Sequence, residues 1–249
     1  MWWNKKSKNK NIVNWAFDAE RTASLTPLAL LSFPPVSVIS HYYQHNKSPF
    51  IKCPALKSAL QNVYVIKSPI DIEITYDRIG PEMSMNVVTP APASNTSALR
   101  QYLILPRFGE QKGTDANDYC SIMSVPYIFW SEDQSMMLDM MPPFLEWSNP
   151  NEVRVISGQY NIGKWKRHLE YSIELKHKVG KLIFKRGDVM FYVKLTGEDP
   201  HQRINIQPQS ISTNMRLEIQ QNTQLKTVQK KCPLDVLYEL RSQFNKRTS

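Results

Sequence analysis

The sequence predicts a mainly-β fold built around one core, with extra segments at both ends. Residues 70–76 and 169–175 alternate apolar with polar side chains, which is typical of strands that bury one face. Glycine is scarce, with 8 residues, while proline is plentiful, with 17, so stiff loops and strand ends are expected and glycine-rich phosphate-binding loops are not. The length of 249 residues and the hydrophobic content of 41% suffice for one large β domain.

The first 60 residues predict an extended arm that precedes the core. Residues 1–10 carry four lysines and no acid, and an apolar stretch at residues 25–39 contains three prolines, which exclude a continuous helix there. Adjacent tryptophans left in water would promote aggregation, so the arm is expected to dock on its own domain or on a neighbour. The residues expected to make these contacts are Trp2, Trp3, Lys5, Lys6, Trp15 and Phe17. Removal of residues 1–17 is then expected to leave a folded chain that does not assemble.

Residues 61–208 are predicted to form the β-rich core. The expected strands are residues 63–66, 70–76, 102–105, 126–130, 153–157, 169–175, 181–184, 189–195 and 203–206. Turns are expected at residues 179–180 and 186–187, and the small polar residues 90–97 are expected to form a loop. The methionine-rich residues 135–141 fit a helical turn or an exposed patch, although methionine fills cores more often than it forms binding surfaces.

Residues 209–249 are predicted to be a basic helical tail. Pro233 suits a first helical position, and apolar residues follow it at three- and four-residue steps. Residues 211–228 form a weaker, glutamine-rich amphipathic helix. Contacts with a partner are expected from Leu237, Leu240 and Phe244.

The formal net charge of +9 is concentrated at the two ends of the chain. Residues 1–10 contribute +4, and residues 211–249 contribute +4 from seven basic and three acidic side chains, so the body is close to +1. A groove that binds nucleic acid usually gathers basic and aromatic residues on one element. Nucleic-acid contact through the basic ends therefore stays open as an alternative to protein contact.

Cysteine content and hydropathy limit the cellular environments that we expect for the chain. The three cysteines are far apart and form no C-x-x-C pair, so we expect reduced thiols in a reducing compartment, with neither a disulfide framework nor a structural zinc site. No run of 18 apolar residues is present, and the lysine-rich start lacks the apolar region of a secretory signal. We expect no membrane segment.

His168 and Glu170 are the strongest candidates for a catalytic site. They lie two residues apart on a predicted strand, so both point to one face, and His177 or His201 would complete an iron-binding triad. The pair resembles the His-x-acid motif of 2-oxoglutarate oxygenases. The same face continues with other polar residues, as an ordinary solvated strand does, so we expect neither a metal nor a cofactor and assign no catalytic residue.

Residues 157–195 carry a resemblance to a nucleotide-binding fold. This segment resembles the β-clip core of deoxyuridine triphosphatases and deoxycytidine triphosphate deaminases in four features. They are the turn Gly158–Asn161, a nearby tryptophan at position 165, an alternating strand, and a strand that begins at Gly187-Asp188. The family's water-activating aspartate is replaced by Asn161, whose amide cannot act as a general base, and Tyr192 stands where the family has glutamine. The resemblance implies a jelly-roll or β-clip-like sandwich, with the N-terminal arm and C-terminal helix appended, rather than the nucleotidase activity.

A second resemblance is broader and involves residues 50–55, residues 63–69 and the Pro-Pro link that precedes the second half. Here the chain resembles uncharacterised and virion structural proteins of marine, T4-like tailed phages. The resemblance implies a non-enzymatic bacteriophage protein that is assembled in the host cytoplasm, resides in the virion, and contacts copies of itself or other virion proteins. The alternative is an enzyme, either a diverged nucleotide-acting β-clip protein or an Fe(II) oxygenase-like protein.

Overall fold

A computed structural model describes most of the chain. The described residues are 11–18, 33–44, 52–69, 71–79, 82–88, 119–146, 153–175, 179–229 and 232–248. Only the backbone is described for residues 72, 77–79, 82–88, 119–125, 153, 174–175 and 244–248. The predicted strand at 102–105, the predicted loop at 90–97 and the arm residues Trp2, Trp3, Lys5 and Lys6 lie outside the described residues.

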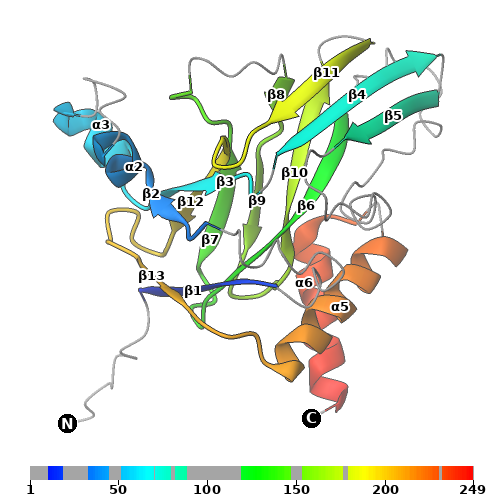
Figure 1. The fold of residues 1–249 in the computed structure, drawn as a ribbon. Coiled ribbons are helices and arrows are strands. Elements are labelled where there is room, and N and C mark those ends of the chain that lie inside the picture. Colours follow the sequence, from blue (N-terminus) through cyan, green and yellow to red (C-terminus); the bar gives the residue numbers. More distant parts are fainter. Residues whose placement is uncertain are drawn as a thin grey trace.

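Two five-stranded sheets form the body of the molecule (Figure 1). The first has the order β13 (Asn205–Pro208), β1 (Ile12–Phe17), β6 (Tyr119–Trp130), β10 (His168–Leu175) and β8 (Val153–Val155). The second has the order β2 (Val36–Ser37), β3 (Val63–Lys67), β12 (Val189–Thr196), β7 (Met137–Met141) and β9 (Gly158–Asn161). Neighbouring strands are antiparallel, except that β1 runs parallel to β13.

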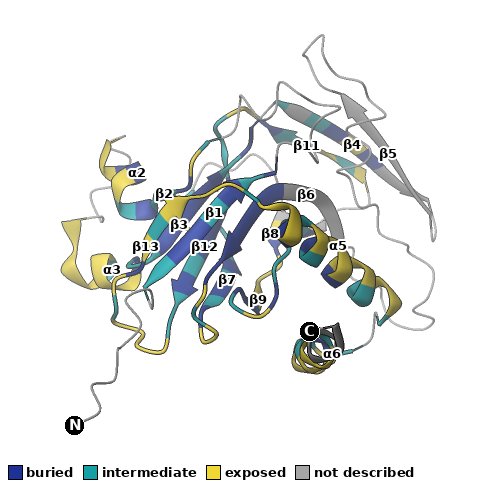
Figure 2. Cartoon of the chain, turned by 90° about the horizontal axis from the view of Figure 1, so that it is seen from below, coloured by how far each residue is buried: buried dark blue, intermediate teal, exposed yellow. Residues whose placement is uncertain are grey.

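A smaller sheet and two pairs of helices complete the described chain. The third sheet has the order β11 (Val179–Phe184), β4 (Ile72–Ile79) and β5 (Glu82–Val88). The helices α2 (Val38–Gln44) and α3 (Pro54–Ala59) lie on one side of the body, and α5 (Thr213–Val228) and α6 (Leu234–Thr248) lie on the opposite side in both views (Figure 1, Figure 2).

The main core lies between the two large sheets. Phe129 and Tyr171 of the first sheet and Phe191 of the second belong to one buried cluster, and the rings of Tyr171 and Phe191 stack with centroids 5.5 Å apart. Leu182 and Phe184 bring the third sheet into the same cluster. The prediction of a mainly-β, sandwich-like protein is confirmed, and two smaller buried clusters accompany the main core.

The predicted boundary at residue 60 is wrong, because two strands that precede it belong to the large sheets. β1 lies between β13 and β6, where Val13 is 0% exposed, and β2 pairs with β3. Trp15 and Phe17 pack on the ring of Tyr127, with centroids 6.3 and 5.2 Å away. These two residues therefore dock on their own domain, and removal of residues 1–17 would take out an inner strand rather than a free arm.

The methionine-rich residues form strand β7 rather than a helical turn or an exposed patch. Met136, Leu138 and Met140 are buried on one side of this segment, as a period of two residues requires, so core filling is confirmed. The predicted turn at residues 179–180 is wrong, because both residues belong to β11. The turn at residues 186–187 is confirmed, and Gly187 supplies its φ of +90°.

Candidate functional site

An open groove lies between α5, α6 and the turn that follows β9. It has a volume of about 1080 Å³. The residues that line it are Gln134, Gly163, Lys164, Lys166, Asn214, Leu217, Glu218, Gln221, Asp235, Tyr238, Glu239, Arg241 and Ser242. Its walls thus combine two lysines from the turn with two carboxylates from α6, around a partly apolar centre.

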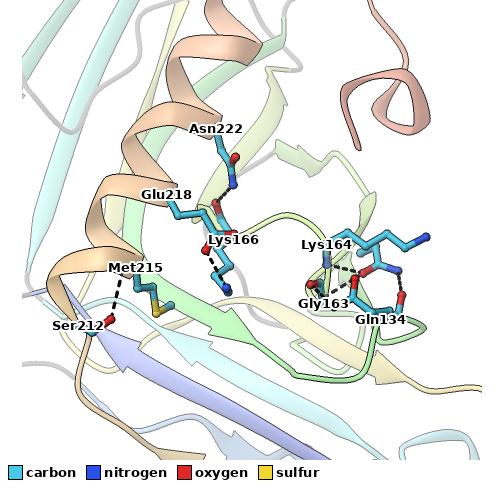
Figure 3. A network of polar contacts seen from close by, with 9 residues as sticks. Gln134, Gly163, Lys164, Lys166, Ser212, Met215, Glu218 and Asn222 are labelled. Atoms are coloured by element: carbon cyan, nitrogen blue, oxygen red, sulfur yellow. Dashed lines mark hydrogen bonds and ion pairs between the residues drawn. The ribbon is translucent and has the colours of Figure 1, made fainter. Parts of the chain in front are cut away.

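Helix α5 is fixed to the first sheet by its inward-facing side. Ser212 precedes the helix and accepts a hydrogen bond from the Met215 amide, which satisfies one of the free amide groups at the helix start. Glu218 binds Lys166 Nζ at 2.8 Å, and Asn222 Nδ2 donates to the Lys166 carbonyl at 3.0 Å (Figure 3). The groove wall formed by α5 is therefore held in place by polar contacts as well as by apolar packing.

Asn161 organises the turn that forms the opposite wall. Its Oδ1 accepts from the amides of Gly163 and Lys164, both at 2.9 Å, and its Nδ2 donates to the Gln134 carbonyl at 2.7 Å. Gln134 in turn donates to the Gly163 carbonyl, and the two residues lie side by side in Figure 3. A Cβ at position 163 would lie 2.1 Å from the Asp133 carbonyl oxygen, so only glycine fits there.

The resemblance to deoxyuridine triphosphatases places a nucleotide-site residue at position 161. Asn161 is 6% exposed, and both polar atoms of its side chain are hydrogen bonded, Oδ1 within its own turn and Nδ2 to the Gln134 carbonyl. The backbone amide of Asn161 also donates to Tyr238 Oη, at 2.9 Å. Asn161 therefore joins its turn to Gln134, in the loop before β7, and to helix α6, and this structural role explains its presence.

Helix α6 contacts the body through one face. Leu237 is 2% exposed in the main core, and Leu234 and Tyr238 pack beside it, with the Tyr238 ring 5.9 Å from that of Trp165. Leu237 therefore does not belong to the exposed face that was predicted to bind a partner. Leu240 is 37% exposed and does belong to it, whereas the side chain of Phe244 lies outside the described residues.

Four apolar side chains of α5 and α6 are exposed and form what we call the helical surface. They are Leu217, Val228, Val236 and Leu240, with exposed fractions of 52%, 77%, 37% and 37%. The outward sides of both helices are largely exposed in Figure 2. None of the four belongs to the buried clusters of the core.

The two predicted iron ligands, His168 and Glu170, are bound by different side chains of the same protein. His168 Nε2 lies 2.9 Å from Asp18 Oδ2, and Arg216 of α5 binds the other oxygen of this carboxylate at 2.6 Å. Glu170 is bound by Arg167 at 2.6 Å and by Lys226 at 3.1 Å. Burial raises the pKa of the Glu170 carboxyl, but the two cations outweigh it, so the net pKa lies below its ordinary value.

These contacts also correct the surface predicted for β10. The polar side of this strand was expected to face water, but α5 covers it through the ion pairs of Asp18 with Arg216 and of Glu170 with Lys226. Asp18 was missed from the sequence, because nothing near it indicates that residues 150 and 198 positions later will approach it. His201, the other described histidine considered as a ligand, is exposed.

Another buried polar cluster joins α2 to the second sheet. Tyr42 Oη lies 2.6 Å from Tyr192 Oη and donates to Glu146 Oε1, also at 2.6 Å. Tyr42 and Tyr192 are 1% and 0% exposed. Burial raises the pKa of Tyr192 to about 12, and burial with the Glu146 hydrogen bond raises the pKa of Tyr42 still further above its ordinary value. Both hydroxyls are therefore neutral and serve packing.

Among the described residues, no group of three or more His, Cys, Asp or Glu side chains is placed to hold a metal ion. None of the described helices has the length and hydropathy needed to cross a membrane. Comparisons with protein families, with curated proteins and with solved structures find no match to the chain.

Proposed function

We propose that the chain is a non-enzymatic virion structural protein that assembles through protein–protein contacts. The helical surface is the observation that carries this proposal. Exposed apolar side chains that gather on one side of a protein mark interaction sites more often than isolated ones do. Leu217 and Val228, at 52% and 77% exposed, are the most open of the four.

The roles of the polar residues support a structural protein. Asn161, His168 and Glu170 were the residues most suggestive of catalysis, and each is held in contacts that join one element to another. Buried polar groups engaged in this way stabilise a unique packing. Their presence is accounted for without a substrate.

The sequence resemblance to virion proteins of T4-like tailed phages is the reason to place this assembly in a phage particle, formed in the host cytoplasm. We propose a fold of jelly-roll or β-clip type, supported by the packing of two five-stranded sheets around one core. Trp2, Trp3, Lys5 and Lys6 are proposed to contact a neighbouring virion protein, with nucleic acid as the alternative partner of the basic ends.

Mass spectrometry of purified virions tests the proposal directly. We expect the chain in the particle at a reproducible copy number relative to the major capsid protein. Absence of the chain from purified particles, with the protein present in infected cells, would overturn the proposal. Stoichiometric iron or zinc in the purified chain would instead favour the enzyme alternative.

A pair of substitutions tests the helical surface within that experiment. The double variant L217D/V228D places two charges on exposed positions, so we expect it to fold normally and to be depleted from particles at least several-fold. The matched control is V179D, because Val179 is 62% exposed on β11, away from the helices. Equal incorporation of both variants would contradict the assignment of this surface.

A further inference from the structure

We propose that α5 is a releasable cover of the first sheet, held largely by charge, whose detachment exposes an apolar patch on β1 and β6. The patch consists of Ala16, Ile128 and Trp130, which are buried in one cluster with Met215 and Ile219 of the helix. This conformational change belongs to the single chain, so it does not depend on the presence of a virion partner.

The side chains of α5 are distributed differently from those of an ordinary surface helix. Such a helix turns its apolar residues toward the core and its charged residues toward water. In α5, Leu217 and Val228 are 52% and 77% exposed. Asn222 is 0% exposed, and Arg216 and Lys226 bind carboxylates of the body. The helix is therefore attached to the sheet through several polar groups, while two of its apolar side chains face outward.

The apolar contacts of α5 are concentrated in its first half. Met215 and Ile219 are its two buried apolar residues, and they belong to a small cluster that is separate from the main core. In the second half, Leu225 is only partly buried against the main core. Helix α6, by contrast, inserts Leu237 into the main core. The second half of α5 thus relies mainly on polar contacts, whereas α6 has an apolar anchor.

Three ion pairs attach α5 to the body at points along its length. They are Arg216–Asp18 at 2.6 Å, Glu218–Lys166 at 2.8 Å and Lys226–Glu170 at 3.1 Å. The second pair is seen in Figure 3, together with the hydrogen bond that Asn222 donates to the carbonyl of the same lysine. The six charged side chains are between 8% and 43% exposed, so dissolved ions reach these contacts.

Loss of these contacts would loosen the helix itself. Helix α5 has 16 residues, and an isolated helix of about this length is marginal in water even with a favourable sequence. Segments with few buried apolar contacts open locally while the rest of a protein stays folded. Helix α5 is therefore expected to open as a unit, with the two large sheets intact and the patch of Ala16, Ile128 and Trp130 exposed.

Amide hydrogen exchange of the full-length chain, followed by mass spectrometry, tests the role of charge. At about 1 M sodium chloride the Debye length is ~3 Å, close to the length of the three ion pairs. Between about 0.05 M and about 1 M salt, we expect exchange of the amides of residues 216–228 to become about tenfold faster. This factor corresponds to about 1.4 kcal/mol, which three partly exposed ion pairs together supply.

The internal controls are residues 238–243 of α6 and the strand β12, whose exchange should change by less than about twofold. Exchange of α5 that does not respond to salt would overturn the proposal. Exchange of α5 that always equals that of β12 would also overturn it, because the helix would then open only when the whole chain unfolds.

Oxidation by hydrogen peroxide tests whether the patch becomes accessible. Met215 belongs to the cluster beneath α5, and Met190, at 1% exposed, lies in the main core. Oxidation to the sulfoxide requires access to the thioether. Met215 should therefore be oxidised several-fold faster at high salt than at low salt, with no change at Met190. An equal response of the two methionines would show that the patch stays covered.

Charge exchange at the central ion pair separates electrostatic attachment from general loosening. K166E and E218K each bring two like charges together, so we expect several-fold faster exchange of α5 at low salt in either variant. The double variant K166E/E218K restores an attractive pair and should return to within about twofold of the wild type. The Lys166 carbonyl, which accepts from Asn222, is kept in all three variants.

The matched control for these variants is K181Q. It removes the ion pair of Lys181 with Glu73, at 2.7 Å on the third sheet, and should leave the exchange of α5 unchanged. Failure of the double variant to restore slow exchange, with circular dichroism showing a folded chain, would overturn the attachment of α5 by charge.

Discussion

Asn161 shows how one side chain supports several parts of the site. Its side-chain oxygen accepts hydrogen bonds from the amides of Gly163 and Lys164, its side-chain nitrogen donates to the Gln134 carbonyl, and its backbone amide donates to Tyr238 of α6. An aspartate would keep the two accepted hydrogen bonds but would lose the donor to Gln134. The turn therefore favours the amide for a structural reason.

Substitutions of Asn161 test this role. N161A should lower the free energy of unfolding by about 1–3 kcal/mol, because buried amides lose their acceptor. N161D should be destabilised as well, since a carboxylate oxygen then faces the Gln134 carbonyl. Urea unfolding measures both, and the same Asn-to-Asp change at exposed Asn205 should stay within about 0.5 kcal/mol.

N161D also supplies the carboxylate that deoxyuridine triphosphatases use. We expect no hydrolysis of deoxyuridine triphosphate by either the wild type or this variant. Hydrolysis that appears with N161D and is missing from N161A would favour the nucleotide-acting alternative.

The tyrosine pair of α2 and β12 predicts an alkaline limit to stability. The pKa of Tyr192 is raised to about 12 in the folded chain, against about 10 when unfolded. The neutral hydroxyl is thus favoured by folding, and its stabilising contribution is complete below pH 10 and is lost as the pH rises through 12. Y192F should show a smaller loss of stability between pH 9 and 11, by urea unfolding.

The same variant lacks the hydrogen bond to Tyr42 and should be about 0.5–1.5 kcal/mol less stable at neutral pH. Y43F is the matched control, because Tyr43 is 61% exposed on the same helix. An alkaline slope that is equal in Y192F and the wild type would show that the tyrosine pair does not limit stability.

At the scale of elements, β1 is the strand whose loss is expected to affect stability most. It is inserted between β6 and β13, and its Val13, Trp15 and Phe17 all contact the main core. Burial of each such side chain contributes about 1.5–3 kcal/mol, so loss of the strand approaches the whole net stability of a typical domain, about 5–15 kcal/mol.

Two truncations distinguish the contribution of β1 to stability from that of the residues before it. Removal of residues 1–10 should leave a cooperative thermal unfolding transition close to that of the wild type, because every described element is kept. Removal of residues 1–17 should abolish this transition, as followed by near-ultraviolet circular dichroism. A folded product of the longer deletion would show that β1 is dispensable.

At the scale of the whole molecule, the sequence predicted both C-terminal helices and several strands, among them β3, β10 and β12, but not the strands β5, β7 and β9. Alternation identified β10, and the spacing of Leu234, Leu237 and Leu240 identified α6. The strand β1 was missed because its partners are residues 119–130 and 205–208, and a pattern of a few residues carries no information on such distant pairing.

The candidate site was predictable only in part, for a related reason. Leu240 is exposed, as a contact residue needs to be, but the burial of Leu237 depends on which face of α6 meets the core. The polar side of β10 looked solvated, because a strand face covered through ion pairs such as Glu170–Lys226 keeps the same polar pattern as one exposed to water. The groove itself is lined by four separate segments that only the fold brings together, namely Gln134, the turn after β9, α5 and α6.

The parallel pairing of β1 with β13 also sets the order of events during synthesis. Ile12 is matched with Asn205, so β1 gains its parallel neighbour only after residue 205 has been made. Until then one edge of β1 is unpaired, and such edges promote association between nascent chains. Nascent chains on neighbouring ribosomes of one messenger RNA would therefore carry the same open edge until β13 pairs with β1.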